Sequence, residues 1–193
     1  MRIIAGIAGG RNLLVPKSGV RPTMDRVKAA IFNMIGPDIE GARVLDLFAG
    51  SGGLGIEALS RGAASCVFVE NHGPSVAIIK RNLESSKLPG GQVVASDVFR
   101  YLRQMGAGSV FDFILADPPY AKAPGERDFG SDLIAVPELA SRLAPDGVLM
   151  LEQLPGTGPR ENSGWVCSKI RRYGATEVAF FQKPDGPRLI SES

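Results

Sequence analysis

Residues Asp117-Pro118-Pro119-Tyr120 directly follow the apolar run 111–116 and bring a carboxylate, backbone carbonyls and an aromatic ring into one short turn. Neither proline has an N–H to donate, and each restricts the residue before it, so the predicted strand must stop at Asp117. The carboxylate and carbonyls can accept hydrogen bonds from an exocyclic amino group, and the ring can stack on the base that carries it. We therefore predict that this turn binds and positions an amino-bearing base.

A second chemical feature begins at the end of the predicted strand 43–48. Segment 46–55 reads Asp-Leu-Phe-Ala-Gly-Ser-Gly-Gly-Leu-Gly, which contains Gly-x-Gly-x-x-Gly, and Glu70 ends the next predicted strand. Glycines let a ligand approach the backbone at a helix N-terminus, whose amides favour an anion. An acid at the end of the second strand can accept from ribose hydroxyls. Alone, the pattern fits a dinucleotide or another cofactor that has a ribose and a carboxylate.

Asp46 favours S-adenosylmethionine over a dinucleotide. An acid just before the glycines would repel a diphosphate but could accept from the cationic amino group of S-adenosylmethionine. Asp97, at the end of the third predicted strand, could accept from the adenine amino group, although an N-cap explains it equally well. The expected cofactor-binding residues are Asp46, Phe48, Ala49, Gly50, Ser51, Gly52, Gly55, Glu70, Asn71, Asp97 and Val98.

The alternation of short apolar runs with helical segments predicts an α/β fold with a mostly parallel sheet. The predicted strands are 43–48, 65–70, 92–95, 111–116 and 147–152, and the predicted helices are 54–61, 74–86, 98–105 and 133–143. Two further strands, 165–173 and 176–182, flank Gly174 and predict an antiparallel hairpin at the C-terminus. The sheet then has seven strands.

The N-terminal segment differs from the rest in pattern and charge. Residues 1–20 predict a short hairpin or extended arm, and apolar positions at helical spacing predict a helix that Thr23 caps and Gly36-Pro37 ends. Residues 1–33 hold six basic residues against one acid, a net +5 in a chain of net +2. A solvated helix face with a basic tail would give the same charge, but the asymmetry also indicates a polyanionic partner. The candidate phosphate contacts are Arg11, Arg21, Arg26 and Lys28, the last two expected off the apolar stripe.

Length and composition narrow the class of protein. A chain of 193 residues with 44% hydrophobic content suits one main domain. It has neither an apolar run of about 18 residues nor the layout of a signal peptide, so we expect a cytoplasmic protein without a membrane span. Cys66 and Cys167 lie far apart in sequence and His72 is the single histidine, which argues against a zinc site or a disulfide. We expect a monomer that holds no metal.

Taken in order, the glycine segment, Glu70, Asp97 and the Asp-Pro-Pro-Tyr turn resemble the class I S-adenosylmethionine-dependent methyltransferases that modify exocyclic amino groups. The resemblance narrows to the RsmD family, the bacterial 16S ribosomal RNA guanine-N2 methyltransferases, over about residues 2–181. The segments that carry it are Ile4-Ala5-Gly6, Gly10-Arg11-Asn12-Leu13, Val15-Pro16, Arg21-Pro22-Thr23-Met24-Asp25-Arg26-Val27, Phe32-Asn33 and Leu45 to Ala63. The Arg-Pro-Thr-x-Asp-Arg segment is the specific part.

The resemblance implies a Rossmann-like fold and methylation of the 2-amino group of one guanine in the 16S RNA of the small ribosomal subunit, with S-adenosylmethionine as cofactor. Under this interpretation, Asp117 and the Pro118 carbonyl accept the two amino hydrogens, and Tyr120 stacks on the extruded base. Residues 1–36 form a basic arm and helix that contact RNA or cofactor, 37–183 the methyltransferase domain and 184–193 a loose tail.

Three other interpretations stay open at this point. Better-known members of the family carry Phe where this chain has Tyr120, and Asp-Pro-Pro-Tyr is also common in adenine-N6 methyltransferases acting on RNA or DNA. The chain leaves little length for the sequence-reading domain that such an enzyme would need. A nicotinamide-dependent oxidoreductase would leave the Asp-Pro-Pro-Tyr turn unexplained. A catalytically silent RNA-binding module would not need Asp46, Glu70 and Asp117.

Overall fold

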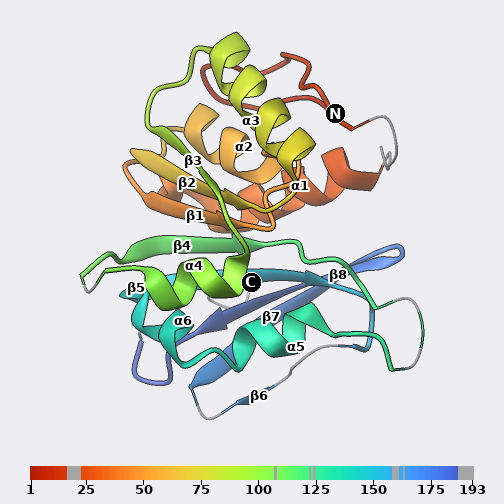
Figure 1. Ribbon diagram of the computed structural model, residues 1–193, viewed down its shortest axis with the longest axis vertical. Coiled ribbons are helices and arrows are strands. Elements are labelled where there is room, and N and C mark those ends of the chain that lie inside the picture. Colours follow the sequence, from red (N-terminus) through yellow and green to blue (C-terminus); the bar gives the residue numbers. More distant parts are fainter. Residues whose placement is uncertain are drawn as a thin grey trace. The chain divides into compact units, whose positions relative to one another are not determined.

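The computed structural model describes residues 1–16, 23–106, 108–121, 123, 125–157, 161–162 and 164–186. The chain forms two compact units, Met1–Val98 and Phe99–Ser193, whose elements are labelled in Figure 1. The first unit holds α1 (Thr23–Ile35), the 3-10 helix η1 (Gly36–Ile39), β1 (Arg43–Leu47), α2 (Gly53–Ser60), β2 (Ser65–Glu70), α3 (Gly73–Ser86) and β3 (Gly91–Ala95). From α4 (Val98–Gln104) the chain continues through β4 (Phe111–Ala116), α5 (Phe129–Ile134), α6 (Pro137–Ser141), β5 (Leu143–Gln153), β6 (Glu161–Asn162), β7 (Trp165–Tyr173) and β8 (Thr176–Gln182).

The three strands of the first unit are parallel and lie in the order β3-β2-β1. Helices α2 and α3 pack on them, and Ile56, Phe68 and Ile79 are fully buried in this core. Parallel strands place their carboxyl ends at the same edge of a sheet. In the observed register Asp46 is opposite Phe68 and Glu70 is opposite Ala95, so the polar residues that end these strands share that edge.

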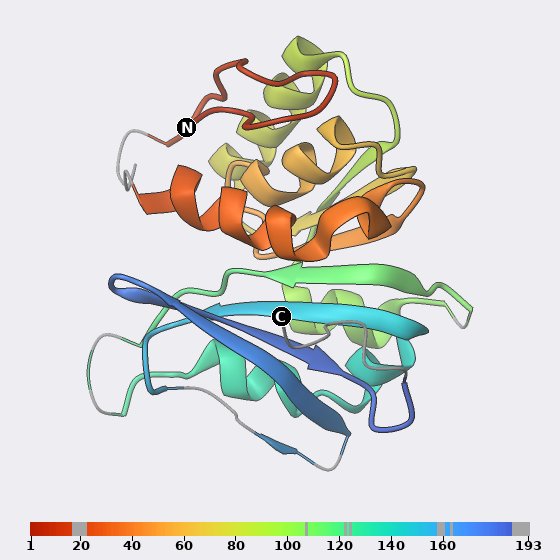
Figure 2. The same cartoon turned by 180° about the vertical axis from the view of Figure 1, so that it is seen from behind.

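The N-terminal arm, residues 1–16, runs along α2 and α3 (Figure 2). An antiparallel bridge between Arg2 and Asn12 closes it into the predicted hairpin. Its Ile7 N–H donates to the Ser60 carbonyl at 2.8 Å, and the Ser60 hydroxyl donates to the Ala5 carbonyl at 2.6 Å. Gly6 has φ +83°, and a Cβ there would lie 1.8 Å from the Ser60 oxygen, so only glycine allows this approach.

Glu57, on α2, fixes the arm and α1 to the core. Its side chain is fully buried, and its two oxygens accept from the Ile4 N–H at 2.7 Å and the Ala5 N–H at 3.1 Å. The same carboxylate lies 3.3 Å from Lys28 Nζ and 2.8 Å from Arg61 Nε. A buried carboxylate with two cations and two amides has partners for its charge, which is what makes its burial tolerable.

The expected exposure of Lys28 is therefore wrong. Its side chain is 4% exposed, and its ammonium donates to the Arg2 carbonyl at 2.5 Å. Burial lowers the pKa of Lys28, while the charge of Glu57 acts in the opposite direction. A lysine is ordinarily expected at the surface. Lys28 is buried because its ammonium pairs with the buried carboxylate of Glu57.

The second unit is a mixed sheet in the order β4-β5-β8-β7-β6. Strand β4 pairs with β5 in parallel, while β5-β8 and β7-β8 are antiparallel. Helices α5 and α6 pack against β5. Phe180 and Phe181, neighbours on β8, are both buried and contribute to the core. The predicted hairpin 165–173 and 176–182 has the same bounds in the structure.

The predicted helix 133–143 is wrong. The region contains two short helices, because Pro137 starts α6 and the preceding residue is extended. Asp128 caps α5 earlier than expected by accepting from the Gly130 and Ser131 amides. Strand β5 already begins at Leu143, and the two-residue β6 lies where no strand is predicted. The other elements match their predicted positions within a few residues.

Two expectations about the chain ends can be compared only in part. Helix α1 begins at Thr23 as predicted, and η1 continues the chain past the expected stop. The side chain of Thr23, and most of the expected tail from 187 onward, lie outside the described residues. Within the described part of the chain, no helix has both the length and the apolar character needed to cross a membrane.

Replacing Glu57 by alanine should lower the free energy of unfolding by about 3–5 kcal/mol, because Lys28 would stay buried without its partner. Urea unfolding measures this change. The matched control is Glu84→Ala, which removes an exposed acid from α3 and should change stability by less than about 0.5 kcal/mol. Equal effects of the two substitutions would contradict the role assigned to Glu57.

Candidate functional site

The glycine turn, residues 48–52, reverses the chain between β1 and α2 through left-handed backbone. Phe48 has φ 57°, Gly50 φ 57° and Gly52 φ 81°. Gly52 is also the N-cap residue of α2 and has no side chain to cap it. Ser51, Gly52 and Gly53 are buried at this helix start, and the Gly52 and Gly55 amides donate to the Ala49 carbonyl and to Asp46. Anion binding by this turn therefore stays a prediction.

Glu70 holds this turn from the end of β2. One carboxylate oxygen accepts from the Gly50 N–H at 2.8 Å, and the other accepts from the His72 N–H at 2.8 Å. Glu70 is 9% exposed. A carboxylate can accept more than one hydrogen bond at each oxygen, so these contacts orient Glu70 and are compatible with the predicted acceptance from a ribose.

Asp46 lies beneath the same turn and is 2% exposed. It accepts from the Gly55 N–H at 2.9 Å. Burial, together with the nearby charge of Glu70, raises the pKa of Asp46 from 3.8 to about 8, against the lowering effect of the Gly55 hydrogen bond. A Cβ at Gly55 would lie 2.3 Å from a ring carbon of Phe68, so glycine here serves close packing of α2 on β2.

Asn82, on α3, joins the glycine turn to the N-terminal arm. Its amide nitrogen donates to the Ser51 carbonyl at 2.9 Å and to the Leu14 carbonyl at 3.0 Å. Its oxygen accepts from the Leu14 N–H at 2.8 Å. The side chain is fully buried, and both of its donated hydrogen bonds and the one that it accepts go to these two segments. Sequence reasoning did not identify this residue.

The remaining predicted cofactor residues lie at the same strand edge. The Ala49 N–H donates to the Val69 carbonyl at 3.1 Å, and the Ser96 N–H donates to the Glu70 carbonyl at 3.0 Å. Asp97 follows Ser96 and immediately precedes α4, whose first residue, Val98, is buried, so the N-cap interpretation of Asp97 stays open. Asn71 is exposed beside Glu70. The structure thus gathers the predicted set, and cofactor binding by it stays a prediction.

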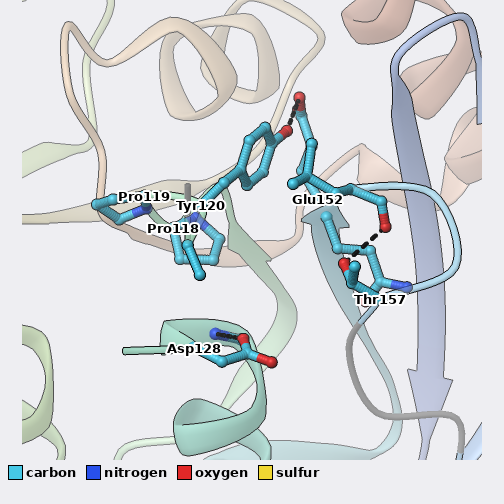
Figure 3. Close-up of a pocket in the computed structure, with 10 residues that line it drawn as sticks. Pro118, Pro119, Tyr120, Asp128, Glu152 and Thr157 are labelled. Carbon is cyan, nitrogen blue, oxygen red and sulfur yellow. Dashed lines mark hydrogen bonds between the residues drawn. The ribbon is translucent and has the colours of Figure 1, made fainter. Parts of the chain in front are cut away.

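A cavity of about 120 Å³ opens beside the Asp-Pro-Pro-Tyr turn in the second unit (Figure 3). Because a single buried water needs about 10–15 Å³, a cavity of this volume can hold a ligand of several atoms. The residues that line it are Pro118, Pro119, Tyr120, Ala121, Asp128, Gly130, Glu152, Gln153, Leu154 and Thr157. Three of the four predicted catalytic residues are in this list, and Asp117 directly precedes them.

Figure 3 shows the Tyr120 hydroxyl and the Glu152 carboxylate pointing toward each other. The Tyr120 hydroxyl donates to Glu152 Oε1 at 2.9 Å. Burial raises the pKa of the Tyr120 hydroxyl well above its ordinary value, and the charges of Glu152 and Asp117 raise it further. Tyr120 is therefore a neutral donor at physiological pH. Glu152 ends a predicted strand, yet the sequence analysis did not single it out.

The four predicted RNA-binding residues differ in their surroundings. Arg11 and Arg26 are exposed. Arg11 also donates to the Ser86 carbonyl at 2.7 Å, at the end of α3. Arg21 lies outside the described residues, and Lys28 is buried against Glu57. The structure thus removes Lys28 from the candidates, because a buried ammonium paired with a carboxylate is not presented to a phosphate.

Comparisons with known proteins identify relatives of this chain. A family model described as "Conserved hypothetical protein 95" matches residues 1–182. YlbH of Bacillus subtilis is 40% identical over 95% of this chain and 99% of its own length. "Ribosomal RNA small subunit methyltransferase D" of Escherichia coli K12 is 35% identical over 95% of this chain and 90% of its own.

A solved structure supports the fold. The T. thermophilus 16S rRNA N2-guanine methyltransferase RsmC, in complex with AdoMet and guanosine, has a TM-score of 0.70 and 27% sequence identity to this chain. The match covers 86% of this chain and 44% of that one. The predicted Rossmann-like methyltransferase fold, with its antiparallel C-terminal hairpin, is confirmed.

The raised pKa of Asp46 predicts a pH-dependent stability. In the folded state the carboxyl stays protonated up to a pH of about 8, whereas the unfolded chain loses this proton near pH 3.9, about its ordinary value. The folded state binds more protons between these values, so this group's contribution to stability falls as pH rises through the window.

Asp46→Asn should remove this contribution. The free energy of unfolding of the wild type, minus that of the variant, should fall by on the order of a few kcal/mol between pH 5 and 8.5. Urea unfolding of both proteins across this range measures the difference. A difference that does not change with pH would show that burial does not raise the pKa of Asp46.

Proposed function

Because this chain belongs to the RsmD family of methyltransferases, we propose that it methylates the 2-amino group of a guanine in the 16S RNA of the small ribosomal subunit. The observation that carries the proposal is the cavity beside Asp-Pro-Pro-Tyr, where an aromatic side chain and acceptor groups lie together. The ribosomal RNA named for the E. coli relative, and the guanosine named for the RsmC structure, support this choice of substrate.

The first unit has the groups that S-adenosylmethionine requires. This cofactor supplies an activated methyl group on a sulfonium. Gly50 and Gly52 allow the left-handed backbone of the turn before α2, and Glu70 is held at the strand edge by the Gly50 amide. Asp46 is aligned by Gly55 below the turn. Glu70, the glycine turn and Asp97 would hold the cofactor, with Asp46 supporting the turn from beneath.

In the second unit, Asp117 and the Pro118 carbonyl would accept the two hydrogens of the guanine amino group, and the Tyr120 ring would stack on the base. The amino nitrogen is a weak nucleophile because its lone pair is delocalised into the ring. Fixing its two hydrogens sets the direction of that lone pair, and such alignment contributes a large part of many rate enhancements. Asp117 would also accept the proton that the nitrogen loses.

An adenine-N6 methyltransferase is the second candidate, because the ring of Tyr120 can stack on either base and an adenine amino group offers the same two hydrogens. A nicotinamide-dependent oxidoreductase would leave the cavity of the second unit without a role. The identity of the methylated nucleoside separates the first two.

The test incubates the protein and labelled S-adenosylmethionine with unmethylated small subunits, naked 16S RNA and duplex DNA, and then identifies the labelled nucleoside. We expect N2-methylguanosine from subunits. Asp117→Ala should lower kcat by about 100-fold or more and leave the affinity for the cofactor within a few fold. N6-methyladenosine, or label in DNA, would overturn the guanine assignment. Wild-type turnover by the Asp117 variant would overturn its catalytic role.

Arg11 and Arg26 are the described candidates for contacts with RNA phosphates. Each phosphate contact contributes about 0.7–0.9 to the slope of log affinity against log salt. The double variant Arg11→Gln/Arg26→Gln should therefore reduce this slope for subunit binding by about 1.5. The control is Arg171→Gln/Arg172→Gln, which removes two exposed charges from β7. If both double variants keep the wild-type slope, Arg11 and Arg26 do not contact RNA phosphates.

A further inference from the structure

The cavity beside the Asp-Pro-Pro-Tyr turn has no positive charge in its lining. Among the described residues that line it, Asp128 and Glu152 are acids, and none is lysine, arginine or histidine. A nucleotide brings a phosphate with its base, and phosphate contacts supply much of the affinity in nucleic-acid complexes. Because acids in the lining repel a phosphate, a cation that holds the RNA backbone must lie outside the lining residues.

Arg127 is an exposed cation next to this cavity. Within 108–157, the described residues with a positive charge are Arg127 and Arg142. Arg142 is 8% exposed and donates to two carbonyls just after α4, each at 2.8 Å. The side chain of Arg127 is 52% exposed, and the residue that follows it, Asp128, lines the cavity (Figure 3). Arg127 is therefore placed to meet a phosphate at the rim.

The guanidinium of Arg127 rests on two aromatic rings. Its Cζ atom lies 4.5 Å from the ring centroid of Phe99, on α4, and 4.6 Å from that of Phe129, on α5. The two ring centroids are 6.3 Å apart, so the guanidinium occupies the angle between the rings. Phe99 is 6% exposed and gives a firm support. Since aromatic faces attract a guanidinium, these contacts restrict an otherwise long and flexible side chain.

Asp132 fixes the direction in which this guanidinium points. Arg127 Nε donates to Asp132 Oδ2, in the first turn of α5, at 2.6 Å. A guanidinium has five N–H groups, of which Nε carries one. The four on Nη1 and Nη2 have no acceptor among the described residues. These two atoms form the planar fork that matches two oxygens of one phosphate.

Packing alone does not account for an arginine at this place. The two ring contacts need a cation, and a lysine can supply one. The bond to Asp132 needs a single N–H, which a lysine also has. What the arginine adds is the Nη fork, which the rings and the acid leave to solvent. A fork that is already held loses little side-chain entropy when it binds an anion.

We propose that Arg127 binds a phosphate of the RNA backbone beside the nucleotide whose base enters the cavity of the second unit. This assignment rests on the proposed function and adds a phosphate-binding residue to it. It places one RNA contact in the second unit, whereas Arg11 and Arg26 belong to the first.

The test measures the affinity of the wild type and of Arg127→Gln for unmethylated small subunits over a range of salt concentrations. The slope of log affinity against log salt should be smaller for the variant by about 0.7–0.9, the share of one phosphate contact. Affinity at low salt should fall by about tenfold, and affinity for S-adenosylmethionine should stay within about twofold. The matched control is Arg171→Gln, an exposed arginine on β7, which β8 separates from β5. It should keep the wild-type slope.

Arg127→Lys separates phosphate binding from charge and packing. Lysine keeps the cation but lacks the fork, so this variant should keep the wild-type slope and lose part of the affinity. If Arg127→Gln keeps the wild-type slope while N2-methylguanosine still forms, the assignment of Arg127 is wrong and the proposed function stands. A loss of affinity for S-adenosylmethionine at an unchanged slope would assign Arg127 to the cofactor instead. If the wild type labels DNA and no RNA, both proposals are overturned.

Discussion

The buried carboxylate of Glu57 is the constraint on which the first unit depends. Helix α2 follows the glycine turn and carries Glu57 in its interior, so the helix next to the predicted cofactor residues also anchors the arm and α1. Two amides and two cations converge on this one side chain. An acid in that place is costly without its partners, and the partners come from three separate segments. The charge therefore specifies one arrangement of these segments and disfavours others.

The two units differ in the polar groups that surround their candidate sites. The first unit combines backbone amides above a helix start with acids that the same amides orient. Beside the cavity of the second unit, the side chains of Tyr120, Gln153 and Thr157 each donate a hydrogen bond to another protein group. Under the proposed function, the turn would serve the cofactor and the cavity would serve the base. Neither property can be read from net charge, which is only +2 for the chain.

The sequence was a good guide where one local rule decides the outcome. Alternating apolar runs located the strands, Gly174 marked the hairpin turn, and two prolines ended β4. It failed where a distant residue decides. Lys28 looks like a surface lysine until Glu57 is placed beside it, and Asn82 resembles any polar helix residue. The contacts of Glu152 and Gln153 cannot be predicted locally, because their partners on the Asp-Pro-Pro-Tyr turn and on β8 lie far away in the sequence. In the helix expected at 133–143, Pro137 is a break, since it starts the separate helix α6.

Asn82 shows how a hairpin can end against a helix. Its carbonyl and amide meet the N–H and C=O of Leu14 in the way that a peptide group of a neighbouring strand would. The side chain thus imitates a strand partner and satisfies the backbone of the arm at the point where pairing would otherwise stop. Aspartate has the same shape but no donor, and leucine has neither group, so a carboxamide is the group that can end the hairpin here. The arm needs no third strand because one side chain of α3 takes that place.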